Sequence, residues 1–217
     1  MFEISITIAL LLVAYLIGSF PTGYLAVRWL KGVDIRELGS GSTGATNVLR
    51  TLGKAPAIGV LLMDAAKGAV SIALAHWTFN FFHITSIPLP TVVALAALSA
   101  VIGHSWPIWL GFRGGKSVAT SLGILLAMSW QVGLATLGVF AVMMAISRIV
   151  SLSSISGAIA VSLFMIIFKQ PLAYQIFALA AGIYVIWRHR SNIQRLLSGT
   201  EPKLGQKLST ETEQAPS

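Results

Sequence analysis

The residues best suited to chemistry in this chain form polar clusters that are separated by long apolar stretches. The clusters combine glycine, hydroxyl-bearing and basic residues, and in order they are GSGSTGATN with Arg50, GHSWP followed by GFRGGKS, SRIVSLSS, and RHRSN with Arg195. Few carboxylates accompany them. Cations and hydroxyls in this balance favour substrates that carry phosphate. A hydrolase that uses paired carboxylates or a metal needs ligands that the clusters lack, so we expect no metal and no cofactor.

The first cluster, residues 39–47, formally contains the GxGxxG pattern, but dinucleotide binding also needs a preceding strand in a βαβ unit. Small residues such as Gly41 let backbone N–H groups approach an anion, and a following helix start adds a positive dipole. Ser40, Thr46 and Asn47 offer neutral donors, and Arg50 offers a bidentate fork for phosphate. The cluster therefore predicts an anion site, and a flexible connector is the alternative interpretation.

The second cluster contains His104 and ends in a sequence close to the P-loop pattern GxxxxGK[ST]. Leu110 stands where that pattern requires its first glycine, and no strand precedes it, so nucleotide hydrolysis is excluded. The turn of Gly114, Gly115 and Lys116 still predicts a small anion site at a helix start, with Lys116 as a mobile charge. The alternative is an ordinary basic flank of a membrane span.

The third and fourth clusters each allow two interpretations. Ser151 and its neighbouring serines are most simply helix N-caps. If the last apolar helix continues into the fourth cluster, His189 and Asn192 share one face at i, i+3. Such a pair can bind phosphate or move a proton, although a lone interfacial histidine is often only solvated. Asp64 and Lys67 lie three apart inside an apolar stretch and can pair, either for packing or for chemistry.

The composition places these clusters on a membrane protein. Of 217 residues, 55% are hydrophobic and 10% are charged, whereas soluble domains carry roughly 25% charged residues. The chain has no cysteine, so disulfides and thiolate metal sites are excluded. The net charge of +8 indicates, first, how the chain is oriented in the membrane, because basic loops lie on the cytoplasmic side. It also indicates attraction to anionic lipid or to phosphate. We therefore expect an all-α, polytopic membrane helix bundle.

The apolar stretches set the expected topology. They are residues 4–27, 55–80, 88–110, 117–147, 154–168 and 172–187, with a polar loop at 28–54. If 117–147 forms a hairpin of two short helices that turns at 129–131, the chain has about seven transmembrane helices. The N-terminus is then outside and the C-terminus is cytoplasmic, with all four clusters on the positive side. The alternative of five spans, with 154–187 as one broken helix, puts Arg148 outside.

The sequence divides into a membrane domain, residues 1–197, and a tail, residues 198–217. The tail is rich in Ser, Thr, Glu, Gln and Lys, which predicts a mobile cytoplasmic segment. The four clusters, although far apart along the chain, are expected to converge on a single phosphate-binding pocket at the inner leaflet.

Over nearly its whole length the chain resembles the bacterial acyl-phosphate:glycerol-3-phosphate acyltransferases, the PlsY-type membrane enzymes. The matching stretches are LIGSFPTGYL, DIRELGSGSTGATNVLR, DAAKG, GHSWPIWLGFRGGKSVAT, RIVSLSS and HRSNIQRLLSGTEPKLG. Two positions depart from the family pattern, because Ser42 stands where Asn is common and Ser117 where Gly is frequent. The common acyl-CoA signature, a histidine with an aspartate five positions later, is absent at His104, which is followed at that spacing by Trp109.

The resemblance implies transfer of an acyl group from acyl phosphate to the 1-hydroxyl of glycerol 3-phosphate, which gives lysophosphatidic acid and phosphate. It places the enzyme in the bacterial plasma (inner) membrane, in phospholipid synthesis, with a cytoplasmic active site and no obligate protein partner or nucleic acid. Acyl phosphate is already activated, so no covalent nucleophile is needed and transfer is expected to be direct.

The expected site residues divide between the two substrates. The acyl phosphate would be held by Ser40, Thr46, Asn47 and Lys116, and the glycerol 3-phosphate by Arg50, Lys116, Ser151, His189 and Asn192. Gly41, Gly114, Gly115 and His104 complete the substrate-binding set, while His189, Lys116, Ser40 and Asn192 are the catalytic candidates. His189 and the donor's own phosphate are both candidates for the base. A membrane transporter of an organic phosphate and a lipid-binding scaffold are the competing classes.

Overall fold

The computed structural model describes residues 1–206, and all of the described secondary-structure elements are helices, as the sequence predicts. The helices are α1 (Phe2–Ser19), α2 (Thr22–Lys31), η1 (Ile35–Glu37), α3 (Ala45–Leu52), α4 (Lys54–Phe81), α5 (Leu89–Ser105), η2 (Ile108–Leu110), α6 (Val118–Met128), α7 (Trp130–Ser147), α8 (Val150–Ile167), α9 (Leu172–Arg188) and α10 (Arg190–Leu197). Residues 207–217, the rest of the expected tail, lie outside the described part.

Several helices are long and apolar enough to cross a membrane. Within residues 1–206 there are five such segments: Phe2–Lys31, Lys54–Phe81, Leu89–Leu110, Trp130–Ser147 and Val150–Ile167. The apolar helices α6 and α9 are shorter. Large apolar side chains remain exposed along these helices, for example Leu12, Leu62, Ile146, Ile166 and Ile183. Such exposure suits a surface in contact with lipid.

The first apolar stretch, expected as one span over 4–27, is broken in the structure. Helix α1 ends at Ser19, and α2 begins at Thr22. Pro21 lacks an N–H group and restricts the residue before it to extended backbone, so Phe20 leaves the helix with ψ 119°. The break exposes the carbonyl of Phe20, which accepts a hydrogen bond of 3.0 Å from Lys67 Nζ on α4.

The ambiguous stretch 117–147 forms two helices that meet at Ser129. Helix α7 turns back and packs against α6. The two helices approach so closely at Gly133 that an added Cβ atom would lie 2.9 Å from the backbone nitrogen of Leu126. The stretch 154–187 is likewise two helices, α8 and α9, rather than one broken helix. These two helices pack so closely at Gly182 that an added Cβ atom would lie 2.6 Å from the carbonyl oxygen of Ala158.

Small residues allow other helices of the bundle to pack closely as well. A Cβ atom at Gly123 of α6 would lie 1.8 Å from the carbonyl oxygen of Ala65 on α4. Close approach of this kind is common where membrane helices pack without a hydrophobic driving force between them. Helix α6, which begins directly after Lys116, is therefore fixed against α4.

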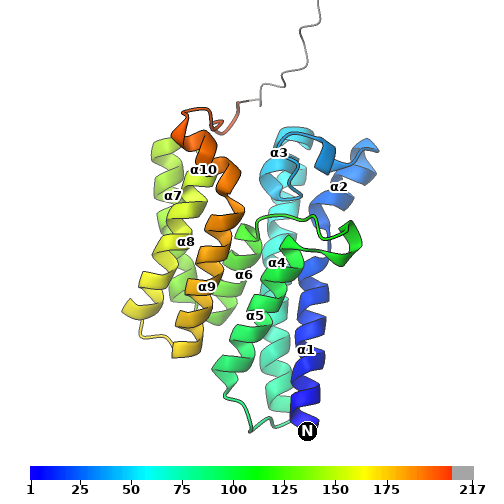
Figure 1. Ribbon diagram of the computed structural model, residues 1–217, viewed down its shortest axis with the longest axis vertical. Helices are drawn as coiled ribbons and strands as arrows, with labels where there is room; N and C mark the ends of the chain where they lie inside the picture. Colours follow the sequence, from blue (N-terminus) through cyan, green and yellow to red (C-terminus); the bar gives the residue numbers. More distant parts are fainter. Residues whose placement is uncertain (207–217) are drawn as a thin grey trace, which may run out of the picture.

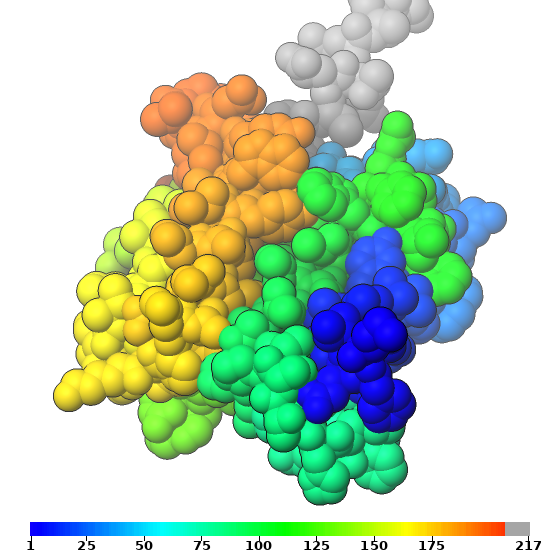
Figure 2. Space-filling model, turned by 60° about the horizontal axis from the view of Figure 1, so that its bottom comes forward, coloured from blue at the N-terminus to red at the C-terminus, as the bar shows by residue number. Residues whose placement is uncertain are grey.

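The two ends of the bundle differ in chemistry. The N-terminus and the connections α4–α5 and α8–α9 lie at the lower end in Figure 1, and α2, α3 and α10 lie at the upper end. Figure 2 brings the lower end forward and shows the N-terminal residues against the α4–α5 connection, where Glu3 accepts hydrogen bonds from Thr85 and Ser86. Among residues 1–206, Lys169 is the one lysine or arginine at this end, which also carries His83 after α4. The polar clusters are thus gathered at the other end.

Candidate active site

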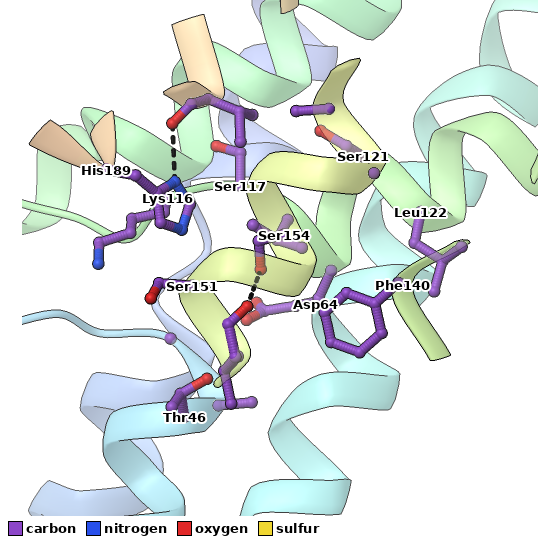
Figure 3. Close-up of a pocket in the computed structure, with 18 of the residues that line it drawn as sticks. Thr46, Asp64, Lys116, Ser117, Ser121, Leu122, Phe140, Ser151, Ser154 and His189 are labelled. Atoms are coloured by element: carbon purple, nitrogen blue, oxygen red, sulfur yellow. Dashed lines mark hydrogen bonds between the residues drawn. The ribbon is translucent and has the colours of Figure 1, made fainter. Parts of the chain in front are cut away.

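A cavity of about 280 Å³ opens among α3, α4, α6, α7, α8, α9 and α10. All four polar clusters contribute to its wall. The sequence-predicted residues that line it are Ser40, Thr46, Asn47, Arg50, His104, Lys116, Ser151, His189 and Asn192. Figure 3 shows Lys116, His189 and Ser151 toward one side of this cavity and Leu122 and Phe140 toward the other. The predicted convergence of distant segments on one pocket is therefore present.

The loop of the first cluster is shaped by Asn47, which is 1% exposed. Its Oδ1 accepts a hydrogen bond from the backbone N–H of Ser40 at 3.1 Å. Its Nδ2 donates to the carbonyls of Ile35, Leu38 and Ser42 at 3.2, 2.9 and 2.9 Å. The amide of Asn47 is thus bonded to the loop backbone, whereas its sequence context predicts a contact with substrate. Ser40, Ser42, Thr46 and Arg50 are left as the polar side chains that this segment offers to the cavity.

A chain of hydrogen bonds joins the second cluster to the fourth. Lys116 Nζ donates to Asn192 Oδ1, across 76 positions of sequence. Asn192 Nδ2 donates in turn to Glu201 Oε1 at 2.6 Å. Burial lowers the pKa of Lys116 to about 8, although the nearby Glu201 carboxylate opposes the shift. The result is an ammonium group that is held in place at the cavity wall and is partly shielded from water.

Glu201 is a functional candidate that does not stand out in the sequence, because it falls in the segment 198–217, whose composition predicts a mobile tail. It is 8% exposed and also accepts hydrogen bonds from Ser151 Oγ and Arg195 Nε, both at 2.7 Å. Burial disfavours its charged form, but the hydrogen bonds from Asn192, Ser151 and Arg195 outweigh this and hold its pKa below the usual value. Glu201 thus adds a carboxylate to the cavity wall, although few carboxylates accompany the polar clusters in the sequence.

His189 lies at the junction of α9 and α10 and is buried. Its Nδ1 is 2.7 Å from the carbonyl oxygen of Val185, which can only accept, so Nδ1 carries the proton and Nε2 a lone pair. Burial, together with the charge of Lys116, lowers the pKa of His189 to about 4. The side chain is therefore neutral at physiological pH and offers an acceptor.

Arg50 and Ser151 complete the polar half of the cavity. Arg50 is half-buried, and burial lowers its pKa from the ordinary value while the charge of Glu201 opposes the change. Ser151 lies in the first turn of α8 and donates to Glu201, so it has a role beyond that of an N-cap. A cation and a hydroxyl that line the same end of the cavity can both contact an anionic ligand.

Three predicted glycines do not line the cavity. Gly41 has φ +67°, a conformation that glycine adopts without strain, and it shapes the 39–47 loop. Gly114 and Gly115 are buried against His104: a Cβ atom at Gly114 would lie 2.2 Å from the carbonyl oxygen of His104, and one at Gly115 would lie 2.1 Å from Nε2. These two glycines position Lys116 and do not contact the cavity themselves.

The rest of the cavity is mainly apolar, although Asp64, Ser121, Thr136 and Ser154 also line it. It is lined by residues of α4, α6, α7, α8 and α9, among them Leu61, Leu122, Leu125, Leu137, Phe140, Val161, Phe177 and Ala181. One cavity thus joins a cationic and hydroxyl-rich end to a hydrocarbon-like end. This combination fits an amphiphile with an anionic head and an acyl chain.

The family model described as "Glycerol-3-phosphate acyltransferase" matches residues 8–199. The chain belongs to this family. A glycerol-3-phosphate acyltransferase of Trichormus variabilis is 65% identical over 216 residues, covering 95% of this chain and 96% of the relative. One from a Nostoc species is 64% identical over 223 residues, covering 99% of each.

Members of the acyltransferase family also share this fold. A crystal structure of PlsY (YgiH), an integral membrane glycerol 3-phosphate acyltransferase in its glycerol 3-phosphate form, is 39% identical and superposes with a TM-score of 0.83. The alignment covers 92% of this chain and 96% of that one. The lysophosphatidic acid form of the same protein has a TM-score of 0.80, with 95% of its chain covered. The likeness thus extends over nearly the whole of this chain.

Proposed function

We propose that this chain acylates the 1-hydroxyl of glycerol 3-phosphate with acyl phosphate as donor, releasing lysophosphatidic acid and phosphate. The observation that carries the proposal is the cavity itself, in which Arg50, Lys116 and Asn192 line a polar end continuous with an apolar one. The glycerol-3-phosphate acyltransferase relatives support the acceptor. The donor is supported by the residues: an acyl phosphate matches both ends of the cavity and needs no covalent nucleophile.

Each substrate has a place in this proposal. Ser40, Thr46 and Lys116 bind the phosphate of the donor, and its acyl chain follows the apolar residues of α6, α7 and α9. Arg50 and Ser151 bind glycerol 3-phosphate, with Asn192 and Glu201 keeping Lys116 between the two phosphates. Asn47 serves by holding Ser40 in place, since its amide is bonded to the loop.

The transfer is direct. The 1-hydroxyl oxygen of glycerol 3-phosphate attacks the acyl carbonyl carbon, the bond from that carbon to the phosphate oxygen breaks, and the bonding pair leaves with phosphate. Lys116 stabilises the negative charge that develops, and proximity of the bound substrates supplies much of the acceleration. The hydroxyl proton passes to the leaving phosphate or to His189 Nε2.

A substitution separates these two bases. With a pKa of about 4, His189 is a weak base, although its neutral Nε2 can accept a hydrogen bond from a glycerol hydroxyl. If His189→Ala raises the KM for glycerol 3-phosphate and nearly keeps kcat, the histidine orients the acceptor and phosphate takes the proton. A large fall in kcat with unchanged KM identifies His189 as the base.

For the membrane arrangement we propose seven crossings, with α6 and α9 as the short ones, the N-terminus outside and the active site on the cytoplasmic side of a bacterial plasma membrane. The support is the distribution of lysine and arginine residues. In the described part of the chain, Lys169 is the one that lies at the end of the bundle opposite the polar clusters. Residues 1–197 form the membrane domain, and Glu201 belongs functionally to it. In this cysteine-free chain, Ser191→Cys and Gln170→Cys should react with a membrane-impermeant thiol reagent from opposite sides. Reaction of both from the same side contradicts the topology.

The activity is tested with purified protein in lipid vesicles, supplied with acyl phosphate and glycerol 3-phosphate. Formation of lysophosphatidic acid without a second protein supports the transferase. Uptake of glycerol 3-phosphate without acylated product identifies a transporter, and binding without either identifies a scaffold. Acyl-CoA replacing acyl phosphate with equal efficiency contradicts the proposed donor.

A further inference from the structure

A buried group of charged side chains lies beside the cavity and has no part in the transfer described above. Asp64 and Lys67 of α4 form an ion pair with 2.8 Å between Lys67 Nζ and Asp64 Oδ1. They are 1% and 8% exposed. A buried ion pair is weak support for stability, because desolvation offsets the attraction. Charges at membrane depth are costly, so their retention points to a function.

The environment of Lys67 explains its own position. Its Nζ donates to the carbonyl of Phe20 at 3.0 Å, at the break between α1 and α2. Thr22, the first residue of α2, donates its hydroxyl to Asp64 Oδ1. These contacts tie α4 to the break, but they do not explain why Asp64 also lines the cavity.

Asp64 has a further neighbour in His104, on α5. The distance from Asp64 Oδ1 to His104 Nδ1 is 3.6 Å, longer than a hydrogen bond. His104 Nδ1 is buried and has no hydrogen-bond partner among residues 1–206. The carboxylate is thus the acceptor within reach of an Nδ1–H group, and contacts of this type often shorten when substrate binds. A carboxylate in this place fixes both the tautomer and the orientation of the imidazole.

The imidazole in turn packs against the turn that carries Lys116. A Cβ atom at Gly115 would lie 2.1 Å from His104 Nε2, so ring and backbone are in direct contact. The Gly115 N–H donates to the backbone carbonyl of His104 at 3.2 Å. Arg188 also donates to the carbonyls of Gly114 and Gly115, at 3.2 and 2.8 Å. The turn is thus in contact with a guanidinium and an imidazole, and the imidazole lies 3.6 Å from Asp64.

We propose that Asp64 is a positioning residue for the transfer: it orients the His104 ring, which holds the Gly114–Gly115 turn so that the Lys116 ammonium enters the cavity. This inference rests on the role proposed above for Lys116. Misplacing a binding group by about 1 Å costs on the order of 10²-fold in rate. Asp64 acts through His104 and touches neither substrate.

The first test compares Asp64→Asn with the double variant Asp64→Asn/Lys67→Met. The single variant leaves the Lys67 charge buried without its partner, so its melting temperature falls. The double variant removes both charges, and we expect it to regain the wild-type melting temperature while its kcat stays about 10- to 100-fold low. Recovery of kcat together with the melting temperature overturns the proposal, because the pair then serves only to join helices.

The second test uses His104→Phe, which keeps a ring against Gly115 and removes Nδ1. We expect a loss of kcat similar to that of the Asp64 and Lys67 double variant, and combining the substitutions should add less than about twofold, because they break one contact. Losses that multiply contradict the proposal. Wild-type turnover is measured alongside: absence of product from wild type refutes the proposed function, whereas active wild type with unimpaired variants refutes only the positioning role.

Discussion

The substitution Glu201→Gln tests whether the C-terminal segment is part of the site. Glu201 Oε1 accepts hydrogen bonds from Ser151 and Asn192, and Oε2 accepts one from Arg195. A glutamine has nearly the same shape, but its NH2 group cannot accept, so at least one of these bonds becomes a contact between donors. Hydrogen bonds to charged groups contribute about 1.5–3 kcal/mol each.

The loss reaches Lys116 through Asn192, whose Oδ1 accepts from the ammonium. If the whole free energy of the lost hydrogen bond is lost from the stabilisation of the transition state, kcat/KM falls by about 10- to 100-fold, since 1.36 kcal/mol corresponds to a factor of ten. Glu201 also opposes the lowering of the Lys116 pKa, so the alkaline limb of the pH profile should move to lower pH in the variant.

The assay is steady-state formation of lysophosphatidic acid as a function of pH, with Glu37→Gln as the matched control. Glu37 is exposed and is not among the cavity residues, so its substitution should leave the profile unchanged. Wild-type kcat/KM and an unmoved alkaline limb in Glu201→Gln would refute the role given to this carboxylate.

Three further predictions follow from the site and from the packing. Because burial lowers the pKa of Lys116 to about 8, its positive charge is lost as pH rises through that value, so kcat/KM should decline above about pH 8. Lys116→Arg should move this alkaline decline of kcat/KM to higher pH. If the decline stays at the same pH, it belongs to the titration of another group. Ala181→Leu should reduce kcat/KM for a hexadecanoyl donor about tenfold more than for a decanoyl donor, by filling the apolar end; equal losses contradict that path for the chain. Gly123→Ala, whose Cβ would lie 1.8 Å from the Ala65 carbonyl, should lower the melting temperature, whereas Gly59→Ala, with open space around it, should not.

Much of the architecture was predictable from periodicity and charge. The helix α4 begins and ends within a residue of the stretch 55–80, since apolar composition marks where a helix leaves a membrane. The turn at Ser129 followed from a polar interruption in a stretch of awkward length. The break at Pro21 was missed although its signal is local: a proline ends the helix before it.

The convergence of the clusters was predictable from their shared side of the membrane, but the partners of each side chain were not. The sequence around Asn47 predicts that its amide donates to substrate. Only the fold brings the carbonyls of Ile35 and Leu38 to this amide.

Glu201 was hidden for a similar reason. Its partner Ser151 lies 50 positions away, and the composition after residue 198 is typical of a solvated tail. A single buried carboxylate carries no periodic signal, so neither its burial nor its bonds follow from sequence pattern alone.

The central claim is that one cavity transfers an acyl group directly between two phosphate-bearing substrates. The most direct measurement is a single-turnover reaction of purified protein with acyl phosphate that carries ¹⁸O in the bridging oxygen, analysed by mass spectrometry. The account predicts lysophosphatidic acid and phosphate in equal amounts, with the label entirely in the phosphate. Phosphate released without acylated product, or label in the product ester, would contradict it.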